Sequence, residues 1–132
     1  MTEPLSMDQK LDLHYAIPLH LRDEHIRHAI RRPGLGRIEP APERKDPIAV
    51  CCYGPSLRDT WEQAAAFPTV MSMSGSHQFL VERGRIPNLH VEVDPRPHKV
   101  GLIGPPQEPT VYYVSSCCHP AVFDHLKAVN VR

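Results

Sequence analysis

The sequence predicts an α/β fold of the Rossmann-like class, with a mainly parallel sheet and flanking helices. Two observations carry this prediction. From residue 46 onward, short apolar segments typical of strands alternate with segments of about ten residues typical of helices, and this alternation builds βα units with parallel strands. Small or polar residues follow each predicted strand, as expected at the ligand-binding edge of an open α/β sheet.

The predicted elements follow one another in strict order. Gly84 is a natural C-terminal cap for the second core helix, and Pro120 occupies the favoured first position of the third. Because the chain stops as a fifth strand begins, we expect a truncated version of a longer domain. Strands are expected at residues 48–52, 69–73, 89–93 and 110–114, with a fifth starting at 129–131, and helices at 57–66, 76–83 and 120–128.

Residues 1–45 differ in pattern from the core at 46–132 and are predicted to form an N-terminal arm. Residues 21–32 fit one amphipathic helix, which Pro33 and Gly34 end. A polar, proline-rich connector then leads into the core. The expected buried face of the arm helix consists of Leu21, His25, Ile26, Ala29 and Ile30.

Charge and composition exclude several classes of protein. The 132 residues contain 15 lysines and arginines against 15 aspartates and glutamates, so no basic field indicates a nucleic-acid partner. No apolar run approaches the ~20 residues of a membrane span. The start, MTEPLSMDQK, lacks the order of a secretory signal. We therefore expect a cytoplasmic protein with neither a nucleic-acid nor a membrane partner.

The four cysteines form two adjacent pairs, Cys51-Cys52 and Cys117-Cys118. Neither pair has the spacing of a zinc or redox motif. Adjacent residues of a strand point to opposite faces, so each pair is poorly placed to hold one ion. Small buried thiols are the favoured interpretation.

The turns after the first two predicted strands are candidate phosphate sites. Gly54, Pro55, Ser56 and Leu57 lead into a helix, whose N-terminus favours negative charge. Ser56 with Asp59 three residues later fits ordinary helix capping equally well. Gly75 and Ser76 offer a second such turn, with the same alternative.

The third predicted strand and the residues after it are more polar. His90, Glu92 and Asp94 alternate with apolar residues, so the strand lies at an edge or its polar face borders a cleft. Asp94 is a candidate ligand of Mg²⁺ or of a ribose hydroxyl, or simply begins an Asp-Pro turn. The nearby basic residues, Arg96, His98 and Lys99, would meet phosphates or form a solvated loop.

His119 comes directly before Pro120 at the start of a predicted helix. A histidine in this position can act as a general acid or hold a leaving phosphate. Its alternative role is to cap the helix N-terminus.

Together these segments resemble the MptE-like family, which includes the archaeal 6-hydroxymethylpterin diphosphokinase, motility-associated glycosyltransferase-like proteins and short phage proteins. The resemblance runs from about Asp46 to the last residue. It rests on GPSL after the first strand, a small-residue turn after the second, and the stretches LVERGRIPNLHVEVDPRPHK and YYVSSCCHPAVFDHL. Many relatives carry asparagine or serine just before the GPSL glycine, where this chain has Tyr53. Many also carry asparagine in the second turn, where this chain has Ser74-Gly75-Ser76.

The resemblance implies a Rossmann-like domain that binds a nucleotide or nucleotide-sugar donor. That donor is ATP with Mg²⁺ in the diphosphokinase and a CMP-sugar in the glycosyltransferase-like relatives. By position, Gly54–Leu57 and Gly75-Ser76 match nucleotide-binding turns, Asp94 the acidic strand end, and His119 a histidine near the donor. If active, the protein is a transferase. The alternative is a non-catalytic nucleotide-binding or interaction module whose apolar patch drives homo-oligomerisation.

Overall fold

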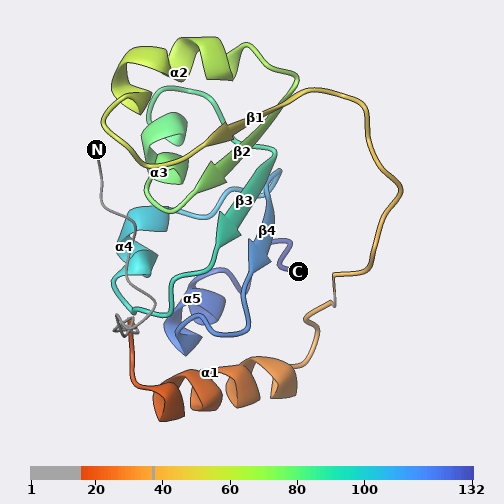
Figure 1. Ribbon diagram of the computed structural model, residues 1–132, viewed down its shortest axis with the longest axis vertical. Helices are drawn as coiled ribbons and strands as arrows, with labels where there is room; N and C mark the ends of the chain where they lie inside the picture. The colour runs from red at the N-terminus through yellow and green to blue at the C-terminus, as the bar shows by residue number, and fades with distance from the viewer. Residues whose placement is uncertain (1–15, 37) are drawn as a thin grey trace, which may run out of the picture.

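Four parallel strands form the sheet in the computed structural model, which describes residues 16–36 and 38–132 (Figure 1). Residues 1–15 and 37 of the predicted arm lie outside the described residues. The strands are β1 (Ile48–Cys51), β2 (Thr69–Met73), β3 (Leu89–Glu92) and β4 (Val111–Val114), adjacent in that order. The predicted α/β fold with a parallel sheet is confirmed. At the predicted fifth strand, Val131 forms one parallel bridge with Tyr112 of β4.

The helices match the predicted ones except for one short element. None that the structure describes is long and apolar enough to cross a membrane. The helix α4 was not predicted, because the prolines before it indicated a loop. The helices are α1 (Leu19–Arg31), α2 (Leu57–Ala65), α3 (Ser76–Val81), α4 (Lys99–Ile103) and α5 (Pro120–His125).

The helices α2 to α5 cover one face of the sheet. Right-handed crossovers between strands in sequential order place every connecting helix on the same side. Cys51 and Val70 of the sheet pack in one buried cluster with α2 and α3, and Tyr112 and Val114 pack in another with α4 and α5. Because the strand order never reverses, these four strands form no topological switch point of the kind that often holds a nucleotide.

The polar face of β3 turns toward the helices. Of the two alternatives that the sequence left open for β3, the edge strand is wrong, because β3 pairs with both β2 and β4. His90 and Glu92 are buried. His90 Nδ1 lies 2.9 Å from Ser72 Oγ, and its ring lies 5.0 Å from that of His77 on α3. Burial, followed by the charge of His77, lowers the pKa of His90 to about 3, so this buried ring is neutral near pH 7.

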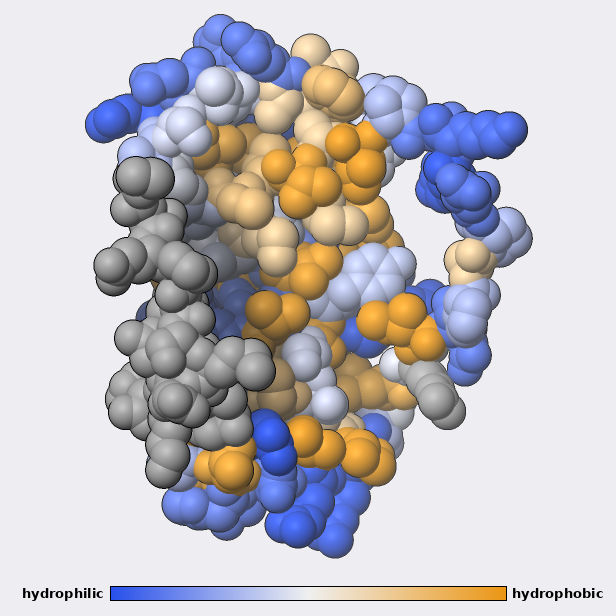
Figure 2. Space-filling model, in the orientation of Figure 1, coloured by the Kyte–Doolittle hydropathy of each residue, from blue (hydrophilic) through white to orange (hydrophobic). Residues whose placement is uncertain are grey.

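The opposite face of the sheet is apolar, and no buried core cluster of the described residues includes it. Figure 2 shows hydrophobic side chains gathered over the strands, beside the arc of the connector. Val50 is 54% exposed. The outward positions, identified by their alternation with buried residues, are Ile48, Val50, Thr69, Met71, Met73, Leu89, Val91, Val111 and Tyr113.

The helix α1 packs against α5 and the loop after β4. His25 is buried, and its Nδ1 lies 3.0 Å from the carbonyl oxygen of Cys117. Ala29 joins the cluster around α5, and Arg32, just beyond the helix, forms an ion pair with Asp124. The face predicted for α1 is only partly buried, since Ile30 is 76% exposed.

The cysteines are all free, and one member of each adjacent pair is buried. Cys51 and Cys118 are buried, whereas Cys52 is exposed and Cys117 is half-buried. Burial raises the pKa of both buried thiols, so they are protonated and unreactive near pH 7. The interpretation of small core thiols therefore holds for Cys51 and Cys118.

Candidate functional site

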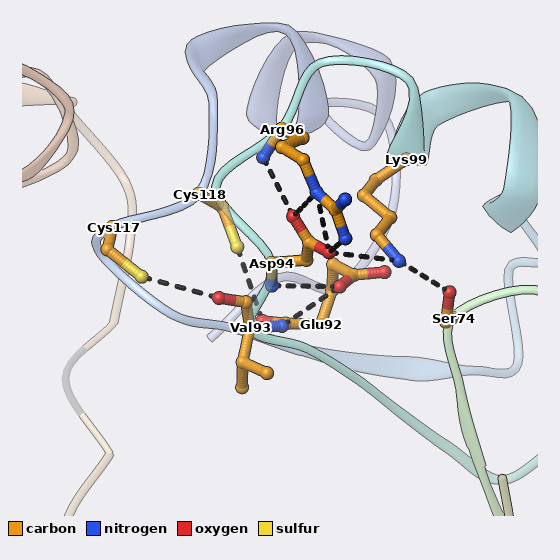
Figure 3. A network of polar contacts seen from close by, with 8 residues as sticks. All are labelled: Ser74, Glu92, Val93, Asp94, Arg96, Lys99, Cys117 and Cys118. Atoms are coloured by element: carbon orange, nitrogen blue, oxygen red, sulfur yellow. Dashed lines mark hydrogen bonds and ion pairs between the residues drawn. The ribbon is translucent and has the colours of Figure 1, made fainter. Parts of the chain in front are cut away.

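The loops after β2 and β3 meet at the carboxyl end of the sheet through Lys99 (Figure 3). Lys99 Nζ donates to Ser74 Oγ at 3.0 Å and lies 3.2 Å from Asp94 Oδ2. Asp94 also accepts from Arg96, whose Nε lies 2.8 Å from Oδ1 and whose Nη2 binds Oδ2. One carboxylate therefore holds two cations, and we call Ser74, Asp94, Arg96 and Lys99 the edge cluster.

The helix α4 places Lys99 in the edge cluster. Asp94 starts a turn in which its Oδ1 accepts the backbone N–H of Arg96 at 3.0 Å. This is the Asp-Pro turn that the sequence offered as an alternative. Lys99 then begins α4 and is buried. The hydrogen bond from Arg96 is the main cause that lowers the pKa of Asp94, and Lys99 adds to it, so Asp94 is ionised throughout the neutral range.

Glu92 lies beneath the edge cluster with one oxygen unpartnered. It is 2% exposed, and its Oε1 accepts the backbone N–H groups of Val93 and Asp94, each at 3.0 Å. Its Oε2 is buried and has no hydrogen-bond partner among the described residues. Such an atom is rare in proteins because its desolvation is not compensated. The strand pattern marked Glu92 as polar but gave no sign that half of its carboxylate lacks a partner.

The turn at residues 54–57 is exposed and accessible to a ligand at residues 54–56, whereas Leu57 is buried in the core. Its helix-starting N–H groups are already used: those of Leu57, Arg58 and Asp59 donate to the carbonyl oxygens of Gly54, Pro55 and Ser56. Ser56 makes no side-chain capping hydrogen bond. A Cβ built at Gly54 meets no atom within 4 Å. The turn borders a shallow hollow of about 290 Å³ between Tyr53, Arg58 and Phe79.

The second turn is occupied by the protein itself. A Cβ at Gly75 would lie 2.6 Å from the ring of Tyr53, so the glycine makes room for this aromatic ring. Ser76 Oγ accepts the N–H of Met73 at 2.9 Å and donates to the carbonyl oxygen of Cys51 at 2.6 Å. Ser76 therefore ties the ends of β1 and β2 together.

His98 and His119, the two histidines predicted as site residues, make no side-chain hydrogen bond to the edge cluster in the described part of the chain. His119 caps α5, since its Nδ1 accepts the N–H of Ala121 at 3.1 Å. Its ring lies edge-on to that of His25, with the ring centres 5.1 Å apart. Burial is the main cause that lowers the pKa of His119, and the charges of His25 and His28 lower it further. His98 is exposed and makes no side-chain cap for α4. Of the predicted site residues, the structure joins Asp94 and Lys99 through direct contacts.

The carboxylate that a magnesium ion would need in the edge cluster is already paired. Among the described residues, no three His, Cys, Asp or Glu side chains are grouped to hold a metal. Asp94 already neutralises two cations, so a divalent cation would have to displace them. Mg²⁺ at Asp94 stays a prediction from the strand-end position and from the family resemblance.

Comparisons with protein-family models, curated proteins and solved structures find no match for this chain. The resemblance to the MptE-like family therefore rests on the sequence segments quoted above.

Proposed function

We propose that this chain binds the phosphate groups of a nucleotide or nucleotide-sugar donor at the edge cluster, as a transferase-like protein related to the MptE-like family. The observation that supports this best is the pair of cations, Arg96 and Lys99, held by one carboxylate where two strand-end loops meet. Ligands of open α/β sheets bind at this edge.

Phosphate can replace Asp94 as the acceptor of these cations. A phosphate group offers three oxygens and up to two negative charges, whereas Asp94 offers two oxygens and one charge. Arg96 is exposed and suits bidentate phosphate binding, while Lys99 supplies a buried positive charge. Asp94 then acts as an internal competitor that keeps both cations in place before the donor arrives.

The turn at 54–57, which is exposed at residues 54–56, supplies the second part of this proposal. The hollow beside Tyr53 and Phe79 offers aromatic surface for a base or sugar. A phosphate chain bound between this turn and Lys99 would cross the ends of β1 and β2. In transfer of phosphoryl groups, most catalysis is positioning and stabilisation of charge. Arg96 and Lys99 provide such charge for either an ATP-dependent or a CMP-sugar-dependent transfer.

The test begins with a thermal-shift titration of ATP, CTP, CDP and CMP, with and without Mg²⁺. Calorimetric titration of the nucleotide that gives the largest shift then measures affinity in two variants. Lys99→Met keeps the aliphatic stem and removes the charge, and we expect about tenfold weaker binding. Asp94→Asn releases the two cations, and we expect binding to become several-fold tighter.

Asp46→Asn is the matched control, because Asp46 forms an exposed ion pair with Arg44 in the connector. Its affinity should equal that of the unmodified chain. Equal affinity in Lys99→Met and the unmodified chain would refute the edge cluster as the phosphate site. Weaker binding of Asp94→Asn only with Mg²⁺ would instead assign Asp94 to a metal.

A second candidate function is a homo-oligomeric interaction module, favoured by the apolar outward face of the sheet. Parallel sheets are normally covered on both faces, and the outward positions carry no charged residue. Two copies can therefore pack these faces together without like-charge repulsion. Strand spacings give a footprint of about 300 Å² per copy, below the ~800 Å² of a standard interface, so we expect a weak dimer.

Sedimentation velocity over a range of concentrations tests this candidate. We expect a reversible dimer that Val50→Glu abolishes, because the substitution places a charge in the centre of an apolar interface. Ile38→Glu is the control, since Ile38 is 61% exposed on the connector. A monomer at every concentration would eliminate the candidate without affecting nucleotide binding.

A further inference from the structure

A pocket of about 560 Å³ lies between α1 and the carboxyl end of β4. Its walls come from segments distant in sequence: the end of α1, the turn after it, the loop after β4, α5 and the last residue. Figure 1 shows α1 below α5, at the end of the molecule toward which β3 and β4 point. The size lies in the usual range for small-molecule sites, and the place is the edge where α/β sheets bind ligands.

Two guanidinium groups of this pocket are incompletely paired. Arg32 uses Nη2 for its ion pair with Asp124, but its Nη1 is buried and has no hydrogen-bond partner among the described residues. An orphaned guanidinium N–H is costly, because its hydration is lost and nothing replaces it. Arg132 lies alongside Gly36, whose Cβ would be 3.2 Å from Arg132 Nη1, and forms no salt bridge in the described part of the chain. A bound anion would give both groups an acceptor.

The surroundings add positive charge and apolar surface. A neighbouring hollow shares Arg32 and is lined by Arg27 and Arg31, and Glu24 is the one carboxylate among its described lining residues. Ile30 is 76% exposed at this pocket, although the spacing of the sequence predicted it to be buried. An exposed isoleucine beside two arginines matches a ligand that is charged at one end and apolar at the other.

We propose that this pocket binds a small organic anion with an apolar body. Arg32 and Arg132 hold its phosphate or carboxylate group, Ser116 donates a hydroxyl hydrogen bond, and Ile30, Leu35 and Phe123 contact the apolar part. The proposal does not rest on nucleotide binding at the edge cluster, because the residues that line this pocket include none of that cluster.

Calorimetric titration with octyl phosphate, below its micelle-forming concentration, tests the proposal. We expect one molecule bound per chain, and at least tenfold weaker binding of octanol and of inorganic phosphate, each of which supplies half of the contacts. Arg132→Gln should weaken octyl phosphate about tenfold by removing a charge-assisted hydrogen bond. Ile30→Glu should weaken it at least as much, by placing a negative charge beside the head group.

Three controls separate this pocket from other surfaces. Ile38→Glu adds the same charge at another exposed isoleucine, Val50→Glu adds it to the outward face of the sheet, and Lys99→Met alters the edge cluster. All three should bind octyl phosphate as the unmodified chain does. No binding by the unmodified chain, equal binding by Ile30→Glu, or a loss confined to Val50→Glu or Lys99→Met would overturn the proposal. Circular dichroism melting confirms that each variant is folded.

Discussion

The two faces of the sheet differ in polarity, and the difference is the reverse of what their exposure would predict. The face beneath the helices carries polar groups, among them Ser72, His90 and Glu92, all buried. The outward face carries almost only apolar side chains, and Val50 there is 54% exposed. Exposure alone therefore does not decide which residues occupy each face.

Hydrogen bonding explains how the covered face tolerates its polar groups. His77 Nδ1 lies 2.7 Å from the carbonyl oxygen of Ile103 and must carry the proton, because a carbonyl oxygen only accepts. His77 Nε2 therefore accepts from the hydroxyl of Tyr112 at 2.8 Å. That hydroxyl oxygen accepts the N–H of Gln107 at 2.7 Å. Directional bonds fix the helices on this face, whereas the outward face provides only non-directional apolar contact.

The largest expected difference between the faces comes from one substitution made on each. Val70→Ala removes two methyl groups from a fully buried site on β2, and the free energy of unfolding should fall by about 2 to 3 kcal/mol. Val50→Ala removes the same groups from the outward face of β1, and the loss should be about 0.5 kcal/mol or less. Urea unfolding at low protein concentration measures both.

Repeating the measurement at high protein concentration sharpens the comparison. If copies pair through the outward face, the cost of Val50→Ala rises with concentration, while that of Val70→Ala does not. Equal costs for the two variants at low concentration would show that the outward face is covered within one chain.

Acid should destabilise the protein through the covered face. The pKa of His90 is about 3 in the folded chain and near its ordinary value of 6.5 when unfolded, so the unfolded state binds more protons below pH 6.5. The contribution of the neutral His90 to stability is therefore fully present above about pH 7.5, and it is lost as the pH falls from 6.5 toward 3. Between pH 7.5 and pH 5, His90 alone should lower the free energy of unfolding by about 2 kcal/mol.

Urea unfolding at pH 7.5 and pH 5.0 tests this effect as a difference between two conditions. His90→Gln should reduce the difference, whatever the substitution does to stability at pH 7.5. Part of the difference should remain, because burial also lowers the pKa of His77. The exposed His98→Gln should keep the full difference. Unchanged stability of the original chain at pH 5.0 would contradict a neutral buried His90.

The fold was predictable where one local signal decided the structure. Alternating apolar residues located the strands, and Pro120 located the start of α5. The helix α4 was missed because Asp94–Pro97 indicate a loop, and only packing beside α3 selects a helix at residues 99–103. Likewise, His90 and Glu92 indicated an edge or a cleft, since no sequence pattern shows that His77 and Tyr112 come from other elements to surround His90.

The candidate site was predictable only in part, for a similar reason. Asp94 and Lys99 were identified because charges after a strand gather at the carboxyl edge. Gly75 has a packing role that the sequence did not indicate, because its missing side chain makes room for the ring of Tyr53. The unpaired atoms of Glu92 and Arg32 had no signal in the sequence. Whether a polar atom finds a partner depends on the positions of residues that are far apart along the chain.

The smallest expected difference between the faces concerns two adjacent tyrosines of β4. Tyr112→Phe removes a hydroxyl that bonds His77 and Gln107 on the covered face, and the free energy of unfolding should fall by about 1 to 2 kcal/mol. Tyr113 points outward, and its hydroxyl has no hydrogen bond among the described residues, so Tyr113→Phe should change stability by less than about 0.5 kcal/mol. Urea unfolding at pH 7.5 measures both. A Tyr113→Phe cost as large as that of Tyr112→Phe would mean that the outward face also depends on directional bonds, and would contradict the contrast drawn between the two faces.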